Sequence, residues 1–210
     1  MSKWNSIIHY RPGRLGKSTI LSSIGLGIRA IVQAAYLLLI SRWLGADGYG
    51  LFAGIVAFFS FATPLANWGS GLLLTQYIAQ DKKNSQGMWA TALVQSGVIG
   101  TLLLTFTLSI AVLFLPQKIA IWSLLLLAIS ELILLPASHA ASSQCFALEH
   151  GNAAVLSVSL VPFGRLVMLL LAIISPWSAT PELAASAHFL GTVIGFAIAF
   201  GLVTWIDGLP

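Results

Sequence analysis

The sequence is poor in charge and nearly free of cysteine. Only 8% of its 210 residues are charged, whereas about a quarter of the residues in a soluble domain carry a charge, because a surface in water must be hydrated. The single cysteine, Cys145, excludes an intrachain disulfide, and we expect it to be a packing residue. The shortage of charge excludes a soluble globule, so the folded chain must present its surface to lipid.

Apolar residues take the place of charge and make up 58% of the chain. A membrane-spanning helix needs about 20 of them, because the hydrocarbon core is about 30 Å thick and a helix rises about 1.5 Å per residue. Runs of this length cover residues 18–44, 49–79, 88–115, 119–148, 153–174 and 183–206. We therefore predict an all-α integral membrane protein: a basic head over residues 1–17, a bundle of about six transmembrane helices over 18–206, and a short end over 207–210.

The positive charges predict the orientation of this bundle, because lysine and arginine favour the cytoplasmic side of a membrane. Six cations precede the first span or lie between the second and third: Lys3, Arg11, Arg14, Lys17, Lys82 and Lys83. Only Arg42 and Lys118 lie in the segments expected on the opposite side. Both termini are therefore predicted to be cytoplasmic. The formal net charge of +4 then needs no nucleic acid partner to explain it.

Three charged residues lie deep inside the predicted spans. Arg29, Glu131 and Arg165 each stand about ten to twelve residues from the start of a span, or about 15–18 Å into the membrane. Such residues usually face the bundle interior or a water-filled cavity. Glu131 could form a structural ion pair with Arg29 or with Arg165. Two cations against one anion leave one positive charge, which favours a cavity for an anionic ligand. We predict that these three residues bind substrate together with Gln33 and Asn67.

Polar residues also recur at helical spacing within the spans, which places them on one face of each helix. The stripes are Ser22, Gly25, Arg29, Gln33 and Tyr36; Ser60, Thr63, Asn67 and Ser70; Thr91, Gln95, Thr105 and Ser109; Glu131, Ser138, Ser142 and Cys145; and His188, Thr192 and Gly195. Small polar residues also line ordinary helix contacts in membranes. Five stripes together with three deep charges nevertheless predict a polar cavity inside the bundle.

The second apolar run is too long for one straight crossing, since residues 49–79 would make some 46 Å of helix by the usual rise of about 1.5 Å per residue. The segment TPLANWGSG, residues 63–71, contains Pro64, which removes a backbone donor, and two glycines that loosen a helix. A helix broken here is tolerated where it faces a cavity. A kink or a tilted, overlong helix fits the sequence equally well.

The stretch Ser41–Gln80 resembles the start of the polysaccharide-biosynthesis exporters of the multidrug/oligosaccharidyl-lipid/polysaccharide flippase superfamily. Members typically end their first helix in Arg-x-Leu-Gly and continue through an acidic or small pair to Tyr-Gly-x-Phe. The matching residues here are Arg42, Leu44, Gly45, Asp47, Tyr49, Gly50 and Phe52, followed by Gly69, Ile78 and Ala79 in the second helix. Gln76 stands where the family pattern has arginine, which weakens a phosphate-binding role at that position.

The resemblance implies that an undecaprenyl-pyrophosphate-linked oligosaccharide, such as an O-antigen or other lipopolysaccharide repeat unit, moves across the bacterial inner membrane by alternating access. The family fold has two six-helix lobes around a central cavity, and this chain resembles the amino-terminal lobe. We expect a fragment or truncated product; two copies that assemble are the alternative. The partners implied are the lipid-linked oligosaccharide, membrane lipids, and a second lobe or a second copy.

Transport is favoured over catalysis by the sequence. His139, His150 and Glu149 lack the spacing of a zinc-binding pair on one helix turn, and no other spacing demands chemistry. We therefore predict no catalytic residue, no metal and no cofactor. A drug/cation antiporter of the same superfamily, a non-transport membrane subunit and an intramembrane enzyme are the alternative functions.

Overall fold

A computed structural model describes residues 14–114 and 119–210, with side chains described from residue 22 onward in those ranges. Most of the predicted basic head and Lys118 therefore lie outside the described residues. Every regular element in the described ranges is a helix: α1 (Arg14–Asn67), α2 (Ser70–Gln80), η1 (Lys82–Asn84), α3 (Ser85–Phe114), α4 (Ile121–Ile129), η2 (Ser130–Leu134), α5 (Leu135–Ala147), α6 (Gly151–Ile174) and α7 (Pro181–Asp207). The predicted all-α class is confirmed.

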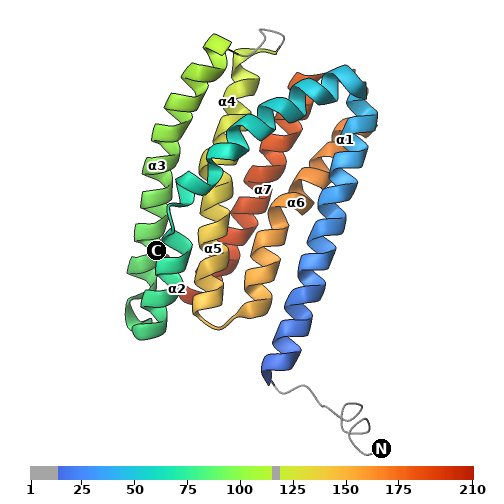
Figure 1. Cartoon of the computed structure of the whole chain (residues 1–210). Coiled ribbons are helices and arrows are strands. Elements are labelled where there is room, and N and C mark those ends of the chain that lie inside the picture. The colour runs from blue at the N-terminus through green and yellow to red at the C-terminus, as the bar shows by residue number, and fades with distance from the viewer. Residues whose placement is uncertain (1–13, 115–118) are drawn as a thin grey trace, which may run out of the picture.

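The helix α1 contains the polar break between the first two predicted spans. At Gly45 the backbone leaves helical geometry, with φ 69° and ψ −178°. The chain reverses its course across the bundle there, as Figure 1 shows. We call residues 14–44 the first arm of α1 and residues 46–67 the second arm. Glycine adopts a positive φ at no steric cost. Gly48 and Gly50 do not use this freedom, so only Gly45 requires it in this turn.

The overlong second run is a broken helix. The second arm ends at Asn67, and Trp68 and Gly69 both take positive φ angles, of 38° and 73°, before α2 begins at Ser70. Pro64 lies within the second arm, one turn before the break. The break lets the apolar run change direction instead of projecting beyond the membrane.

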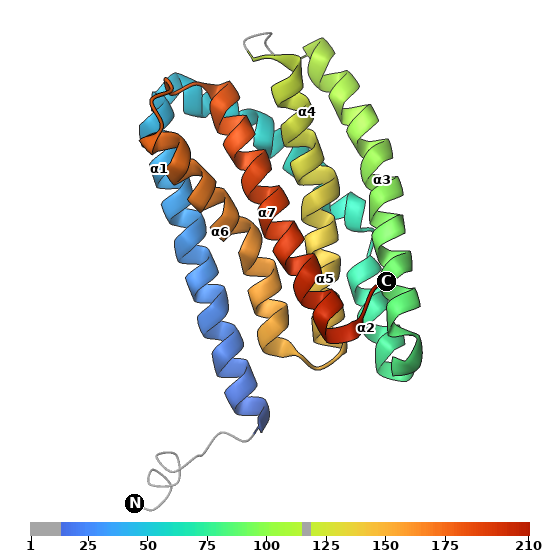
Figure 2. The same cartoon turned by 180° about the vertical axis from the view of Figure 1, so that it is seen from behind.

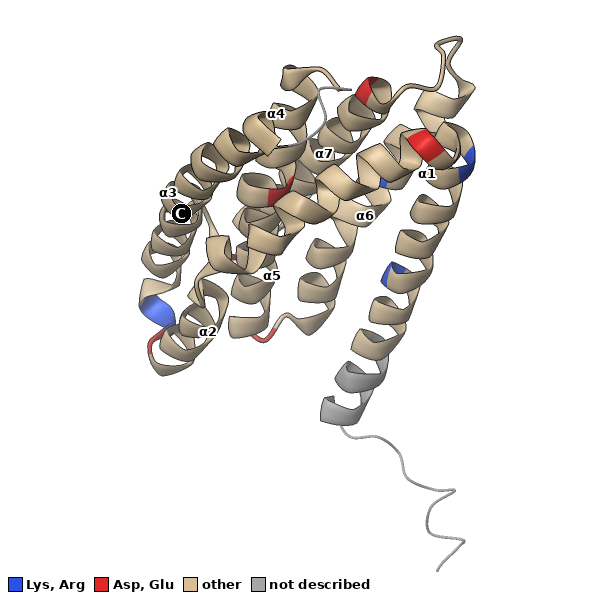
Figure 3. Cartoon of the chain, turned by 45° about the horizontal axis from the view of Figure 1, so that its top comes forward, with Lys and Arg blue, Asp and Glu red and all other residues tan. Residues whose placement is uncertain are grey.

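The bundle has two ends, which we name by a residue at each (Figures 1 and 2). The Gly45 end holds the reversal of α1 and the connection from α6 to α7. The Asp207 end holds the start of α1, the connection from α2 to α3, the turn from α5 to α6 and the end of α7. Figure 3 shows that most charged residues of the described chain lie at these two ends, with a few between them.

The helix that carries Glu131 changes its pitch at that residue. Residues Ser130–Leu134 form one π-helical turn, η2, which the N–H of Leu135 closes by donating to the carbonyl of Ser130. Pro136 follows and has no N–H, so the carbonyl of Leu132 lacks its usual partner four residues on. That carbonyl packs against Gly100 of α3, where any Cβ would collide with it. The π turn is therefore followed directly by a proline and packs closely against α3.

Within the described residues, five helices are long and apolar enough to span a membrane: Ser22–Gln80, Lys82–Phe114, Ile121–Ala147, Gly151–Ile174 and Pro181–Asp207. The first of these stretches has 59 residues and includes the reversal at Gly45 and the break at Trp68. The chain is a multi-pass membrane bundle, as predicted. The number of crossings depends on whether both arms of α1 cross the membrane. Cys145 is a free, buried cysteine, as expected.

Helices α6 and α7 approach each other most closely along a line of glycines. A Cβ on Gly164 would collide with the carbonyl of Gly191, and a Cβ on Gly191 would collide with the backbone of Arg165. A Cβ on Gly195 would meet the backbone of Val161. Small residues let two helix backbones come together in a membrane, where packing rather than the hydrophobic effect drives association. This contact fixes where Arg165 lies relative to α7.

Substituting Gly164 with alanine should therefore destabilise the protein. Overpacking a close contact typically costs about 1–3 kcal/mol. Gly201→Ala on α7 is the matched control, because a Cβ there meets nothing within 4 Å and alanine favours a helix by up to about 1 kcal/mol. Thermal melting of the purified protein in detergent should place Gly164→Ala below wild type and Gly201→Ala at or above it. Equal melting temperatures would contradict the close contact.

Candidate functional site

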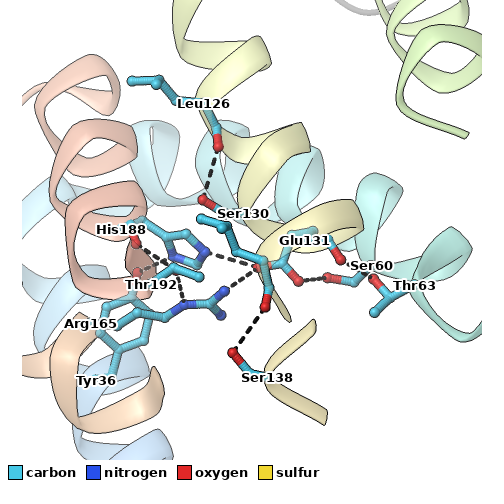
Figure 4. A network of polar contacts seen from close by, with 11 residues as sticks. Tyr36, Ser60, Thr63, Leu126, Ser130, Glu131, Ser138, Arg165, His188 and Thr192 are labelled. Carbon is cyan, nitrogen blue, oxygen red and sulfur yellow. Dashed lines mark hydrogen bonds and ion pairs between the residues drawn. The ribbon is translucent and has the colours of Figure 1, made fainter. Parts of the chain in front are cut away.

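The carboxylate of Glu131 is the centre of a polar network inside the bundle (Figure 4). Its Oε1 accepts a hydrogen bond from Nη2 of Arg165 at 2.7 Å and contacts Nε2 of His188 at 2.9 Å. Its Oε2 accepts from the hydroxyl of Ser60 at 2.9 Å, and the backbone carbonyl of Glu131 accepts from the hydroxyl of Thr63 at 3.0 Å. Glu131 is only 2% exposed, so these groups replace water around the carboxylate.

The guanidinium of Arg165 is held from a second side by α7. Its Nε donates to the hydroxyl of Thr192 at 2.8 Å, and that hydroxyl donates to the backbone carbonyl of His188 at 2.8 Å. Arginine stays charged in proteins and binds carboxylates through a planar fork of donors. A buried ion pair is stable only when further hydrogen bonds satisfy both partners. Arg165 and Glu131 meet that condition.

The imidazole of His188 links the same carboxylate to the first arm of α1. Its Nδ1 lies 2.8 Å from the hydroxyl of Tyr36, which is buried. The ring of Phe52, just after the reversal of α1, meets the imidazole edge-on with ring centroids 5.7 Å apart. The network therefore connects both arms of α1, η2, α6 and α7. The hydrogen bonds around Glu131 thus link segments that lie far apart in the sequence.

The other three predicted site residues lie outside this network. Arg29, Gln33 and Asn67 are half-buried, and none of them forms a hydrogen bond or ion pair with a side chain or backbone group of residues 22–114 and 119–210. Arg29 and Gln33 share a stripe of the first arm with Tyr36 but lie nearer the Asp207 end. The structure thus brings together Arg165 and Glu131 and leaves Arg29 without a counter-ion among the residues that it describes.

The structural ion pair that the sequence suggested for Glu131 is confirmed, and its partner is Arg165. The role of Arg165 and Glu131 in substrate binding stays a prediction. Sequence reasoning did not pair Ser60, Tyr36 or His188 with Glu131, although each stood on a polar stripe. Burial of a carboxylate requires donors, and these stripes were the signal that could have identified them.

One predicted stripe does not face the interior of the bundle. Thr105 and Ser109 of α3 are exposed on this chain, and their hydroxyls donate to carbonyls of their own helix at 2.9 and 2.8 Å. A hydroxyl satisfied in this way adds little cost on an apolar surface. Helical spacing alone could not separate such residues from buried ones. The buried polar residues of α3 include Ser96 and Thr107 instead.

A second polar cluster closes the Asp207 end. The carboxylate of Asp207 accepts from the hydroxyl of Ser85 at 2.7 Å and from Nε2 of Gln144 at 2.5 Å, and its backbone carbonyl accepts from Gln86. These bonds join the start of α3, α5 and the end of α7. No group of three metal-ligating side chains lies close enough to hold a metal ion within the described part of the chain.

Ionisable residues inside membrane spans often mark the pathway of a substrate or an ion. The family model described as polysaccharide biosynthesis protein matches residues 15–208. The chain belongs to this family. Searches of curated proteins and of solved structures found no match. Members of the polysaccharide biosynthesis protein family are generally transporters rather than enzymes.

In this polysaccharide biosynthesis protein, removing one partner of the buried ion pair should cost more than removing both. A buried charge left without its partner typically destabilises a protein by about 3–5 kcal/mol. We expect Arg165→Met to reduce the amount of folded protein in the membrane, and Arg165→Met combined with Glu131→Gln to restore most of it. The measurement is the monodisperse peak of a fluorescent fusion on size-exclusion chromatography.

Arg42→Met is the matched control for this pair, because Arg42 is exposed on α1. It should leave the peak unchanged. A double variant that is no more abundant than Arg165→Met would show that the ion pair does not determine the stability of the bundle.

Proposed function

We propose that this protein moves an undecaprenyl-pyrophosphate-linked oligosaccharide, a repeat unit of O-antigen, lipopolysaccharide or a related polysaccharide, across the bacterial inner membrane by alternating access. Membership of the polysaccharide biosynthesis protein family supports the substrate class. The multi-pass bundle supports the location. In this proposal both arms of α1 cross the membrane, so that the lobe has six crossings. It works opposite a second six-helix lobe, which belongs to a longer form of the same protein or to a second copy.

The observation that carries the proposal is the absence of an ion-pair partner for Arg29 among the described residues. The residue lies within an apolar span. Placing a charge at such depth costs about 2.5–3.5 kcal/mol on insertion scales. Glu131 cannot offset this cost, because Arg165, His188 and Ser60 already surround its carboxylate. An anionic ligand in a cavity beside Arg29 would offset it.

A diphosphate fits this position chemically. Arginine keeps its charge at any relevant pH and binds phosphate oxygens in a forked geometry. Gln33, one turn from Arg29, and Asn67 carry amide groups that can donate to phosphate oxygens. We assign the anion-binding role to these three residues and the tethering of the bundle to Arg165 and Glu131. A groove of about 360 Å³ lies between α1 and α6 and is lined by Ile24, Gly25, Ile28, Asn152, Val155, Leu156, Ser159 and Phe163.

Substituting Arg29 should slow transport without unfolding the protein. For a protein reconstituted into liposomes, the probe is a fluorescently labelled undecaprenyl-pyrophosphate-linked disaccharide, and the readout is the labelled fraction that dithionite cannot reach. We expect Arg29→Gln to slow translocation by about tenfold or more, because a hydrogen bond to a charged group contributes about 1.5–3 kcal/mol. Its thermal melting should match wild type, and Arg42→Gln should transport normally.

Two results would overturn this proposal. The first is wild-type protein that leaves the labelled glycolipid in place but exchanges ethidium against a proton gradient, which would indicate a drug/cation antiporter. The second is an Arg29→Gln variant that translocates the glycolipid at the wild-type rate.

The proposed topology has both termini in the cytoplasm. Eight cations flank the spans, and six of them precede the first span or lie between the second and the third. Lysine and arginine favour the cytoplasmic side. A reporter enzyme fused after Pro210 should therefore show cytoplasmic activity, and one inserted at Asp47, beside the reversal of α1, should show periplasmic activity. Alkaline phosphatase activity after Pro210 would contradict the orientation. Equal behaviour of the two fusions would contradict a crossing by the first arm.

A further inference from the structure

His139 is a polar residue of α5 that the Glu131 network does not use. Its backbone carbonyl accepts from the hydroxyl of Ser143 at 3.0 Å. Its half-buried imidazole forms no hydrogen bond or ion pair with residues 22–114 and 119–210. The charge of Arg29 acts on this ring, as do the charges of Glu131 and Arg165. A ring nitrogen without a partner in a membrane interior is costly unless a ligand or water meets it.

Contacts along α6 show that His139 and Arg29 lie at the same depth. Helix α5 runs antiparallel to α6, and the hydroxyl of Ser142 donates to the carbonyl of Ala154. His139 comes one turn earlier on α5 and so lies level with the next turn of α6, near Ser159. The first arm of α1 runs parallel to α6, and Gly25 packs against Val155. Arg29 comes four residues later and is therefore also level with Ser159.

The second arm of α1 brings Asn67 to this depth as well. Thr63 bonds to the carbonyl of Glu131, and Gly71 packs against the hydroxyl of Ser143 on α5. Asn67 lies midway between Thr63 and Gly71 in sequence, so it is level with the middle of the stretch from Glu131 to Ser143. His139 lies within two residues of that midpoint. Three unbonded polar side chains from three segments thus share one level of the bundle.

We propose that His139 completes the anion site, binding the diphosphate of the lipid-linked substrate from the side opposite Arg29. This inference rests on the proposed function. A diphosphate has more oxygens than one guanidinium can bind, and a second donor on another helix would hold both phosphoryl groups. A bound diphosphate favours the protonated imidazole, which then donates to a phosphate oxygen. The site would then prefer a diphosphate lipid over a monophosphate lipid.

The test measures lipid binding to the full chain in nanodiscs of uncharged lipid. The probes are undecaprenyl pyrophosphate, undecaprenyl phosphate and undecaprenol. Wild type should bind the diphosphate tightest and undecaprenol least. We expect His139→Gln to weaken diphosphate binding by about tenfold, the usual effect of losing one charge-assisted bond, and to leave monophosphate binding nearly unchanged. His150→Gln is the matched control, since His150 is exposed at the turn before α6.

A pH series separates ligand contact from packing. As pH falls from 8 to 6, the diphosphate affinity of wild type should rise relative to that of His139→Gln, which lacks the ring that gains a proton; the comparison removes the titration of the diphosphate itself. The other groups facing the ring are Arg29 on α1, Glu131 on η2 and Arg165 on α6, so Arg29→Gln is measured alongside. That variant should lose affinity at every pH.

The outcomes distinguish the two proposals. If wild type binds the diphosphate lipid no better than undecaprenol, the proposed function fails. If wild type prefers the diphosphate and needs Arg29, while His139→Gln binds like wild type at every pH, only the role of His139 fails. Equal affinity for inorganic pyrophosphate would overturn the lipid assignment, because the site would then bind the free anion. A His139→Gln variant with an unchanged melting temperature and the expected loss would support the inference.

Discussion

The carboxylate of Glu131 lies inside the bundle and needs hydrogen-bond donors there. This requirement determines how the surrounding helices are placed. Water cannot reach the group, so the chain must supply every donor itself. Arg165, His188 and Ser60 do so from three different segments, and Thr192 and Tyr36 hold two of those donors in turn. The close glycine contact between α6 and α7 follows from the same requirement, because it brings Arg165 and His188 to one carboxylate.

Two levels of polar residues between the ends of the bundle differ in how completely they are hydrogen-bonded. Around Glu131 every charged group has its partners, and such a centre rigidifies a structure when its bonding is complete. About two turns nearer the Asp207 end, Arg29, Asn67 and His139 have no such bonds with described residues. The fully bonded level around Glu131 suits a rigid contact between helices. The second suits a place where a ligand arrives and leaves, since no internal bond has to break for it to bind.

Composition and span length were enough to predict the class of the protein, because a chain with so few charges has only lipid as a solvent for its surface. The short segment around Gly45 could be identified as a turn for the same reason. The partners of Glu131 could not be predicted, because periodicity places a residue on a face but not opposite a residue on another helix. Thr105 and Ser109 were misplaced since a self-bonded hydroxyl has the same spacing as a buried one. Ser138 was predicted to share the face of Glu131, whereas His139 was overlooked.

The π turn at Ser130–Leu134 explains why helical spacing selects Ser138 instead of His139, because it changes the direction in which the residues after it project from the helix. Successive residues of an α-helix are rotated by about 100°, so eight residues would set Glu131 and His139 about 80° apart. A π turn absorbs one extra residue, which turns the helix after it back by about 100°. The two side chains then differ by only about 20° and project from nearly the same side of the rod. One inserted residue thus places a tethering group and a candidate ligand group on nearly the same side of one helix.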